Sequence, residues 1–157
     1  MKHFTTLFHV SATDVEEIFQ NSATLKARLA QGERPPLLAG RMMTLLFEKP
    51  SLRTRVSFEA AMTQMGGGSL FLSTADAGLN GRESVADVAR VVGGYSDFIV
   101  MRTFQQSLID RFVDHASAHI INGLSNDNHP CQALTDFFTA REVLGSLSGR
   151  QFVYVGD

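Results

Sequence analysis

The fold is decided by residues 42–62, which read MMTLLFEKPSLRTRVSFEAAM. The first six residues are apolar except for Thr44 and predict a buried strand, whereas the last seven predict a helix. At the turn between them stand the hydroxyl residues Ser51 and Thr54 and the cations Arg53 and Arg55. A helix N-terminus attracts anions, hydroxyls cap it, and arginine forks fit phosphate oxygens. The turn therefore indicates either a site for a phosphate-bearing small molecule or only a capped, solvated helix end.

Length and composition describe one ordinary globular domain. The chain has 157 residues, of which 44% are hydrophobic and 19% charged, so it can form a single core. Its net charge of −2, without a basic run, gives no reason to expect nucleic acid or an anionic membrane as a partner. The one cysteine, Cys131, excludes an intramolecular disulfide, and no apolar run approaches the ~20 residues of a membrane span. Because the N-terminus also has no signal-peptide core, we expect a cytoplasmic protein.

Helical and strand patterns alternate along the chain. Apolar periodicity and helix-breaking residues predict helices from a cap at Thr13 to Gly32, and at 57–65, 83–92, 108–115 and 130–144. Short apolar runs predict strands at 41–47, 69–72, 97–101 and 118–122. Glycines at 66–68 and 93–94 are expected to end the second and third helices. The alternation is typical of an α/β fold with a mostly parallel four-stranded sheet that has helices on both faces.

Two further polar clusters follow predicted strands. Arg102-Thr103 comes directly after the strand at 97–101, and Asn122 and then His129-Pro130-Cys131-Gln132 follow the strand at 118–122. Because ligands of parallel sheets bind beyond the carboxyl ends of the strands, we expect these clusters to meet the turn after the first strand at one edge of the sheet. An arginine at the end of an apolar strand, such as Arg102, either pairs with a buried acid or faces a ligand.

The cluster at 129–132 allows two interpretations. Pro130 suits the first turn of a helix, because its φ is fixed and it lacks an N–H. His129 would then lie at the helix N-terminus, where positive charge is disfavoured, so that a neutral imidazole and the Gln132 amide can grip a carbonyl group. Alternatively, the His–Pro turn only caps the helix. His129 and Cys131 have no second ligand pair for zinc, and no Gly-rich nucleotide loop follows a strand, so we expect neither a metal nor a cofactor.

Three motifs together resemble one known family. Residues 47–59, FEKPSLRTRVSFE, are similar to the carbamoyl-phosphate signature of the aspartate and ornithine carbamoyltransferases, and residues 129–136, HPCQALTD, are similar to their second signature. Arg102-Thr103 matches a third motif, and the order and spacing agree. Within the family, the chain resembles the ornithine branch most, on account of Glu48-Lys49-Pro50, Cys131 and Asn122-Gly123-Leu124.

The resemblance implies carbamoyl phosphate as the ligand and assigns a role to each matching residue. The phosphate would be bound by Ser51, Arg53, Thr54 and the main-chain N–H of Leu52. The carbonyl would be held and polarised by Arg102, His129 and Gln132, where negative charge builds as the carbonyl is attacked. The groups implied to be catalytic are Arg53, Arg102 and His129.

Two positions depart from the family pattern. The family usually has Thr or Gly where this chain has Leu52, so the departure is tolerable only if that position acts through its backbone. In addition, the loop before Glu83 often supplies a polar residue to the site of a neighbouring subunit in this family. Arg82 is the candidate for that role here.

The resemblance also implies a domain organisation. Residues 1–150 would form the carbamoyl-phosphate-binding domain, and residues 151–157, with the apolar run 152–155, would begin a second, ornithine-binding domain that is missing from this chain. The parent enzyme is then expected to be a homotrimer that transfers the carbamoyl group to ornithine, giving citrulline and phosphate in arginine biosynthesis. Ornithine would bind only through the missing domain, so the chain alone is expected to lack turnover.

Three rival interpretations stay open at this point. The parent could be another carbamoyltransferase, with aspartate, putrescine or an acylated ornithine as its acceptor. The chain could be a phosphate-binding module without turnover. It could also be a fragment prone to misfolding, because a final strand at 152–155 would have no sheet to join and would leave an exposed apolar edge.

Overall fold

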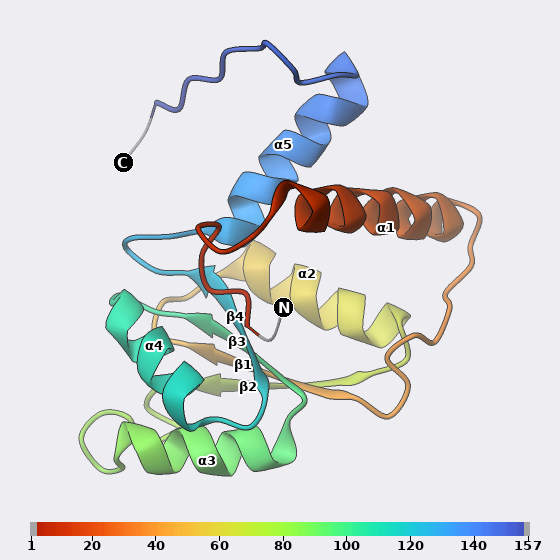
Figure 1. The fold of residues 1–157 in the computed structure, drawn as a ribbon. Helices are drawn as coiled ribbons and strands as arrows, with labels where there is room; N and C mark the ends of the chain where they lie inside the picture. The colour runs from red at the N-terminus through yellow and green to blue at the C-terminus, as the bar shows by residue number, and fades with distance from the viewer. Residues whose placement is uncertain (1–2, 156–157) are drawn as a thin grey trace.

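A computed structural model describes residues 3–155 and shows an α/β fold with one all-parallel sheet (Figure 1). The strands lie in the order β2-β1-β3-β4. Along the chain the elements are α1 (Ala12–Ala30), β1 (Met42–Phe47), α2 (Leu52–Gln64), β2 (Gly68–Ser73), α3 (Val85–Tyr95), β3 (Phe98–Arg102), α4 (Gln106–His115), β4 (His119–Leu124) and α5 (Pro130–Leu144). The predicted fold class is confirmed.

Helices cover both faces of the sheet, as predicted. α3 and α4 lie against one face, and α1, α2 and α5 lie on the side of the other (Figure 1). The strands supply both cores because successive side chains point to opposite faces. In β1, Leu46 packs with the α3 and α4 core, whereas its neighbours Leu45 and Phe47 pack with the α2 core.

The start of α2 differs from the prediction in a way that matters for the site. The helix begins at Leu52 rather than at Ser57, because Ser51 has an extended backbone and accepts a hydrogen bond from the Thr54 N–H at 3.3 Å. A hydroxyl cap of this kind satisfies one of the unpaired N–H groups of the first turn. Arg53 and Thr54 therefore lie in the first turn of the helix and not in a preceding loop.

The start of α1 and the end of α3 also differ from the prediction. Ser11, not Thr13, caps α1, because Ser11 and Asp14 form a reciprocal capping box in which each side chain accepts from the main-chain N–H of the other. α3 runs through Gly93 and Gly94 to Tyr95 instead of ending at them. Gly93 serves packing, since a Cβ there would stand 2.9 Å from the Ser117 nitrogen.

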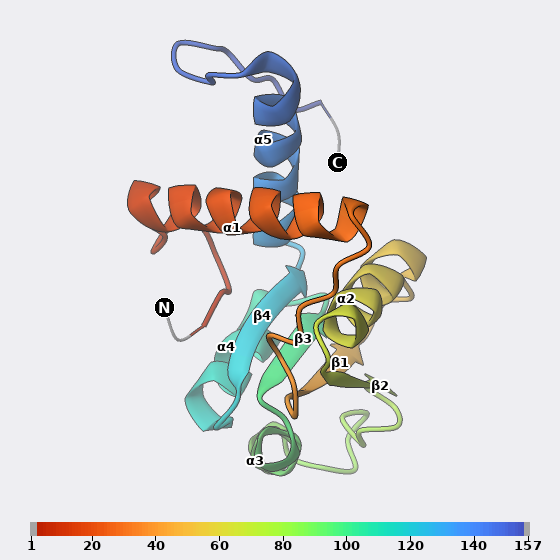
Figure 2. The ribbon, with the colours of Figure 1, turned by 90° about the vertical axis from the view of Figure 1, so that its right-hand side faces the viewer.

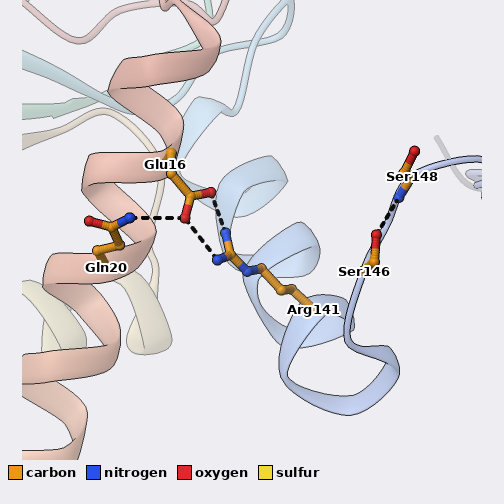
Figure 3. A network of polar contacts seen from close by, with 5 residues as sticks. All are labelled: Glu16, Gln20, Arg141, Ser146 and Ser148. Carbon is orange, nitrogen blue, oxygen red and sulfur yellow. Dashed lines mark hydrogen bonds and ion pairs between the residues drawn. The ribbon is translucent and has the colours of Figure 1, made fainter.

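α1 packs against α5, although the two helices are far apart in the sequence. Figure 2 shows α1 crossing α5, and the Phe19 and Phe138 rings meet edge to face with their centroids 5.5 Å apart. Figure 3 shows the carboxylate of Glu16 facing the Arg141 guanidinium, with 2.8 Å between Oε1 and Nη2. These contacts hold α5, whose other end reaches the carboxyl edge of the sheet.

The two ends of the described chain differ in whether they pair with the sheet. Near the N-terminus, Phe4 pairs with Ile121 of β4 as an isolated parallel bridge. Residues 151–155 form neither helix nor strand and are exposed, although the Phe152 ring rests 5.0 Å from that of Phe137. The strand expected at 152–155 is therefore not formed, since a strand needs a neighbour for its main-chain groups. Within residues 3–155, every helix is too short or too polar to cross a membrane.

The packing of the core predicts that two leucine side chains contribute very differently to the free energy of unfolding. Leu46 of β1 is fully buried in the core beneath the helices α3 and α4, whereas Leu37 is 61% exposed. Leu46→Ala should lower the free energy of unfolding by about 2–5 kcal/mol through lost burial and a new cavity. Leu37→Ala should change it by less than ~0.5 kcal/mol. Urea unfolding followed by circular dichroism measures both, and equal losses would contradict the assigned core.

Candidate functional site

The sheet brings the three predicted polar clusters to one edge. Phe47, at the end of β1, is in register with Arg102 of β3, and Arg102 is in register with Leu124 of β4. The loops that follow these strands must therefore leave the sheet side by side. The α2 N-terminus, Arg102 and the α5 N-terminus consequently lie at the same edge of the sheet, as the sequence predicts.

Arg102 links the end of β3 to the first turn of α2. Its Nη1 donates to Thr54 Oγ1 at 3.5 Å, while its Nε is buried and has no hydrogen-bond partner among residues 3–155. Burial lowers the pKa of Arg102 from its ordinary value. No carboxylate in the described part of the chain lies within 4.0 Å of its guanidinium nitrogens, so the alternative of a buried acid partner is wrong. The free Nε is the kind of donor that a ligand oxygen satisfies.

His129 occupies the N-cap position of α5 without acting as a cap. Its side chain makes no capping hydrogen bond, and its Nδ1 is buried without a partner in residues 3–155. Burial is the main cause that lowers the pKa of His129, the positive charge of Arg102 lowers it further, and Asp136 acts in the opposite direction. The imidazole is thus held neutral at neutral pH, with a ring nitrogen available. The His129 side chain therefore does not cap α5, and its role toward a ligand stays a prediction.

A hollow of about 380 Å³ lies between α2 and α5, and we call it the α2–α5 hollow. Its lining includes Arg53 and Thr54 from α2 and His129, Cys131 and Gln132 from the start of α5. A second hollow, the loop hollow, adjoins it and shares His129 and Gln132. Its lining also contains Lys49, Asp136, Tyr154 and the loop 124–128. His129 and Gln132 therefore stand between two open spaces.

The other predicted residues divide into those at the α2–α5 hollow and those away from it. Arg53 is exposed and lines the hollow, whereas Arg55 turns outward, stacks 3.8 Å over the Phe71 ring and pairs with Glu59 at 3.1 Å. The interpretation of Arg55 as a second phosphate donor is therefore not supported. Gln132 lines the hollow, but its amide donates to Asp136 Oδ1 at 2.8 Å.

Leu52 and Arg82 present their side chains elsewhere. The Leu52 side chain is 77% exposed, so only the main-chain N–H of this first helical residue belongs to the α2 N-terminus. Arg82 lies on the loop after β2, where it pairs loosely with Glu83 at 3.8 Å and lines neither hollow. A role for Arg82 at a neighbouring subunit remains a prediction.

Cys131 is half-buried and lines the α2–α5 hollow at the first turn of α5. Its Sγ donates to the main-chain oxygen of Asn122 at 3.5 Å. Burial raises the pKa of the thiol to about 11, which makes it a poor nucleophile at neutral pH. Cys131 thus packs the first turn of α5 against β4.

Sequence reasoning missed the side chains that tie the loops of this edge together. Glu48 accepts from the Phe104 N–H at 2.6 Å, and Lys49 donates to Asn126 Oδ1 at 2.6 Å. A deeper group connects Asn122, Gln106, Ser125 and Asn128. The only available signal was the turn-forming string at 125–128, SNDN, which does not show where its partners lie.

Comparisons of sequence place the chain in one family. Residues 2–142 match the profile described as aspartate/ornithine carbamoyltransferase, carbamoyl-P binding domain. An ornithine carbamoyltransferase of Anoxybacillus flavithermus is 43% identical over 156 residues, which make up 99% of this chain and 50% of that protein. The chain thus spans about half the length of the curated relatives that it matches.

Solved structures share the fold closely. The ornithine carbamoyltransferase of Pyrococcus furiosus matches with a TM-score of 0.91 and 36% identity, over 94% of this chain and 47% of that one. The aspartate transcarbamoylase of Trypanosoma cruzi, in complex with carbamoyl aspartate and phosphate, matches with a TM-score of 0.87 and 35% identity, over 94% and 48% of the two chains. Enzymes of both branches therefore contain this architecture.

The neutral state of His129 predicts a specific pH dependence of stability. A histidine whose pKa is lowered in the folded state contributes stability above its ordinary value of 6.5, and this stability is lost as the pH falls from there through the lower folded pKa. Between pH 7.5 and 5.5 the free energy of unfolding should therefore fall more for the wild type than for His129→Gln. Urea titrations at both pH values test this, and parallel losses in the two proteins would contradict it.

Proposed function

The chain belongs to the aspartate/ornithine carbamoyltransferase family, and on that premise we propose that it is the carbamoyl-phosphate-binding half of an ornithine carbamoyltransferase. One observation carries the proposal. Two buried donor-capable atoms, Arg102 Nε and His129 Nδ1, have no partner among residues 3–155 and lie beside the capped N-terminus of α2. Phosphate suits the helix end, and a carbonyl oxygen suits the unpaired donors.

In this proposal the α2 N-terminus holds the phosphate. Ser51 and Thr54 offer hydroxyls, Arg53 offers a forked cation, and Leu52 offers its main-chain N–H. The outward position of the Leu52 side chain supports a purely main-chain role, so its replacement of Thr or Gly need not weaken binding. The phosphate leaves as an anion, and Arg53 stabilises its charge.

The carbonyl of carbamoyl phosphate then points toward Arg102, His129 and Gln132. An acceptor amine attacks the carbonyl carbon, a new C–N bond forms, the C–O bond to phosphate breaks, and the proton that the amine loses passes to the departing phosphate. Negative charge develops on the carbonyl oxygen during attack, and fixed donors in a partly buried site stabilise it. Neutral His129 donates an N–H without adding a full charge. To reach the carbamoyl group, the Gln132 amide breaks its hydrogen bond to Asp136 and donates to the ligand instead.

Ornithine is the proposed acceptor because the curated relatives that match nearly the whole chain are ornithine carbamoyltransferases. The proposed reaction gives citrulline and phosphate in arginine biosynthesis. Aspartate is the second candidate, since the Trypanosoma cruzi neighbour is an aspartate transcarbamoylase. Turnover assays with either amine, on a protein that joins this chain to its second half, separate the two.

The remaining parts of the proposal concern the whole enzyme. Residues 1–150 form the carbamoyl-phosphate domain and residues 151–157 lead into the ornithine-binding domain, so the chain alone has no turnover. The enzyme is a cytoplasmic homotrimer in which Arg82 faces a neighbouring subunit, and it uses neither metal nor cofactor. Both hollows are open in the single chain, which is consistent with weak binding until the second domain closes over them.

Binding of phosphate compounds should depend on Arg53 and not on Arg55. Arg53→Ala removes charge-assisted hydrogen bonds worth about 1.5–3 kcal/mol each, so the affinity for carbamoyl phosphate should fall by about tenfold to a hundredfold. Arg55→Ala removes the same charge from the same helix but not from the hollow, and it should leave the affinity within about threefold. Calorimetric titration of both variants measures this difference.

One result of the Arg53 experiment would contradict the assignment of the phosphate to α2. If Arg53→Ala binds carbamoyl phosphate as well as the wild type does, then α2 does not hold the phosphate. Circular dichroism should show both variants to be folded, because neither side chain is part of a core.

His129 should act on the carbonyl and not on the phosphate. His129→Ala should therefore spare the affinity for orthophosphate and reduce the preference for carbamoyl phosphate over orthophosphate by about tenfold, the value of one lost hydrogen bond. Competition titrations with the two ligands measure this preference. An equal loss for both ligands would assign His129 a structural role instead.

A further inference from the structure

We propose that Gln106 is a positioning residue for His129, which it holds in place through the loop 125–128. The inference rests on the proposed function of His129 at the carbonyl. Gln106 is the first residue of α4 and lines neither the α2–α5 hollow nor the loop hollow. Its effect on a ligand must therefore pass through other residues.

The Gln106 side chain is itself fixed in orientation. Its Nε2 donates to Asp110 Oδ1 at 3.2 Å, one helical turn further along α4. This bond turns the amide oxygen toward the loop, where Oε1 accepts from Ser125 Oγ at 2.7 Å and from Asn122 Nδ2 at 3.1 Å. A longer bond of 3.5 Å comes from Asn128 Nδ2. One acceptor atom thus gathers donors from β4 and from both ends of the loop.

The loop is closed on itself by Ser125. Its main-chain N–H donates to the Asn128 oxygen at 2.9 Å, and its hydroxyl oxygen accepts from the Asn128 N–H at 3.0 Å. The hydroxyl can keep that geometry because its own proton is directed to Gln106. Asn128 immediately precedes His129, so the direction in which the chain enters α5 is set where Gln106 holds the loop.

His129 depends on this support because its own side chain has no hydrogen bond in the described structure at Nδ1 and makes no capping bond. Within residues 3–155, the position of the imidazole therefore depends strongly on its backbone and on the packing around it. A second anchor, the Asn126 N–H donating to the Phe104 oxygen at 2.9 Å, involves main-chain atoms and does not need Gln106. Loss of Gln106 should therefore displace the loop without unfolding it.

Four proteins test the proposal: Gln106→Ala, Ser125→Ala, the double variant, and Gln105→Ala as the control. Gln105 is the exposed neighbour of Gln106, and the one hydrogen bond of its side chain within residues 3–155 is accepted from the Ser107 hydroxyl at 3.4 Å. Nuclear magnetic resonance of the imidazole signals gives the pKa of His129, with His129→Ala identifying the peaks. Calorimetry gives the affinities for carbamoyl phosphate and for orthophosphate.

In Gln106→Ala we expect the pKa of His129 to rise toward its ordinary value, because the displaced imidazole becomes more solvated. The preference for carbamoyl phosphate over orthophosphate should fall by about fivefold to tenfold, with the affinity for orthophosphate unchanged. Ser125→Ala should change the pKa of His129 and the ligand preference in the same way. The double variant should show no larger change than either single variant, since both substitutions remove the same connection. Gln105→Ala should match the wild type.

The proposal is overturned if the pKa of His129 is the same in Gln106→Ala as in the wild type, or if Gln105→Ala shifts it equally. The proposal is also overturned if the losses of ligand preference in the two single variants add up in the double variant. If Gln106→Ala does not fold, Ser125→Ala decides by the same readouts. If the wild type binds neither ligand, this chain does not hold carbamoyl phosphate by itself and that part of the proposed function fails, while the titration of His129 still decides whether Gln106 positions the imidazole.

Discussion

The site depends above all on the main-chain register of three adjacent parallel strands. Because Phe47, Arg102 and Leu124 lie at one level across β1, β3 and β4, the chain leaves the sheet three times at neighbouring points. Each exit delivers a different donor: a helix N-terminus, a guanidinium and an imidazole. A slip of one residue in β3 would turn Arg102 to the other face of the sheet. The buried ladder thus sets the spacing of groups that are far apart in sequence.

The alternation of strands and helices could be predicted from the sequence because apolar runs and breaking residues are local signals. The helix ends could not all be predicted. Ser11 and Thr13 are equally plausible caps on composition, and only the geometry of Asp14 selects Ser11. Gly93 has the composition of a helix stop, yet the close approach of α3 to the turn before β4 keeps the helix intact. Such contacts connect distant residues, which no local pattern reports.

The candidate site shows the same division. That the clusters at 51–55, 102–103 and 129–132 share an edge follows from the rule for parallel sheets. The direction of each side chain does not follow from that rule. Arg53 and Arg55 have the same charge two residues apart, but the aromatic ring of Phe71 and the carboxylate of Glu59 draw only Arg55 outward. Gln106 looks like an ordinary helix residue in the sequence, because its partners come from another strand and loop.

The packing of α1 on α5 has a consequence for how the chain is made. Glu16 and Arg141 are 125 positions apart, so α1 leaves the ribosome long before its partner exists. Until then the apolar side of α1 has no permanent surface, whereas β1, α2 and β2 can associate soon after synthesis, since they are close in sequence. Closing so long a loop costs conformational entropy that only the finished sheet can offset. Although α1 is synthesised before the other described helices, it is therefore expected to be among the last to settle.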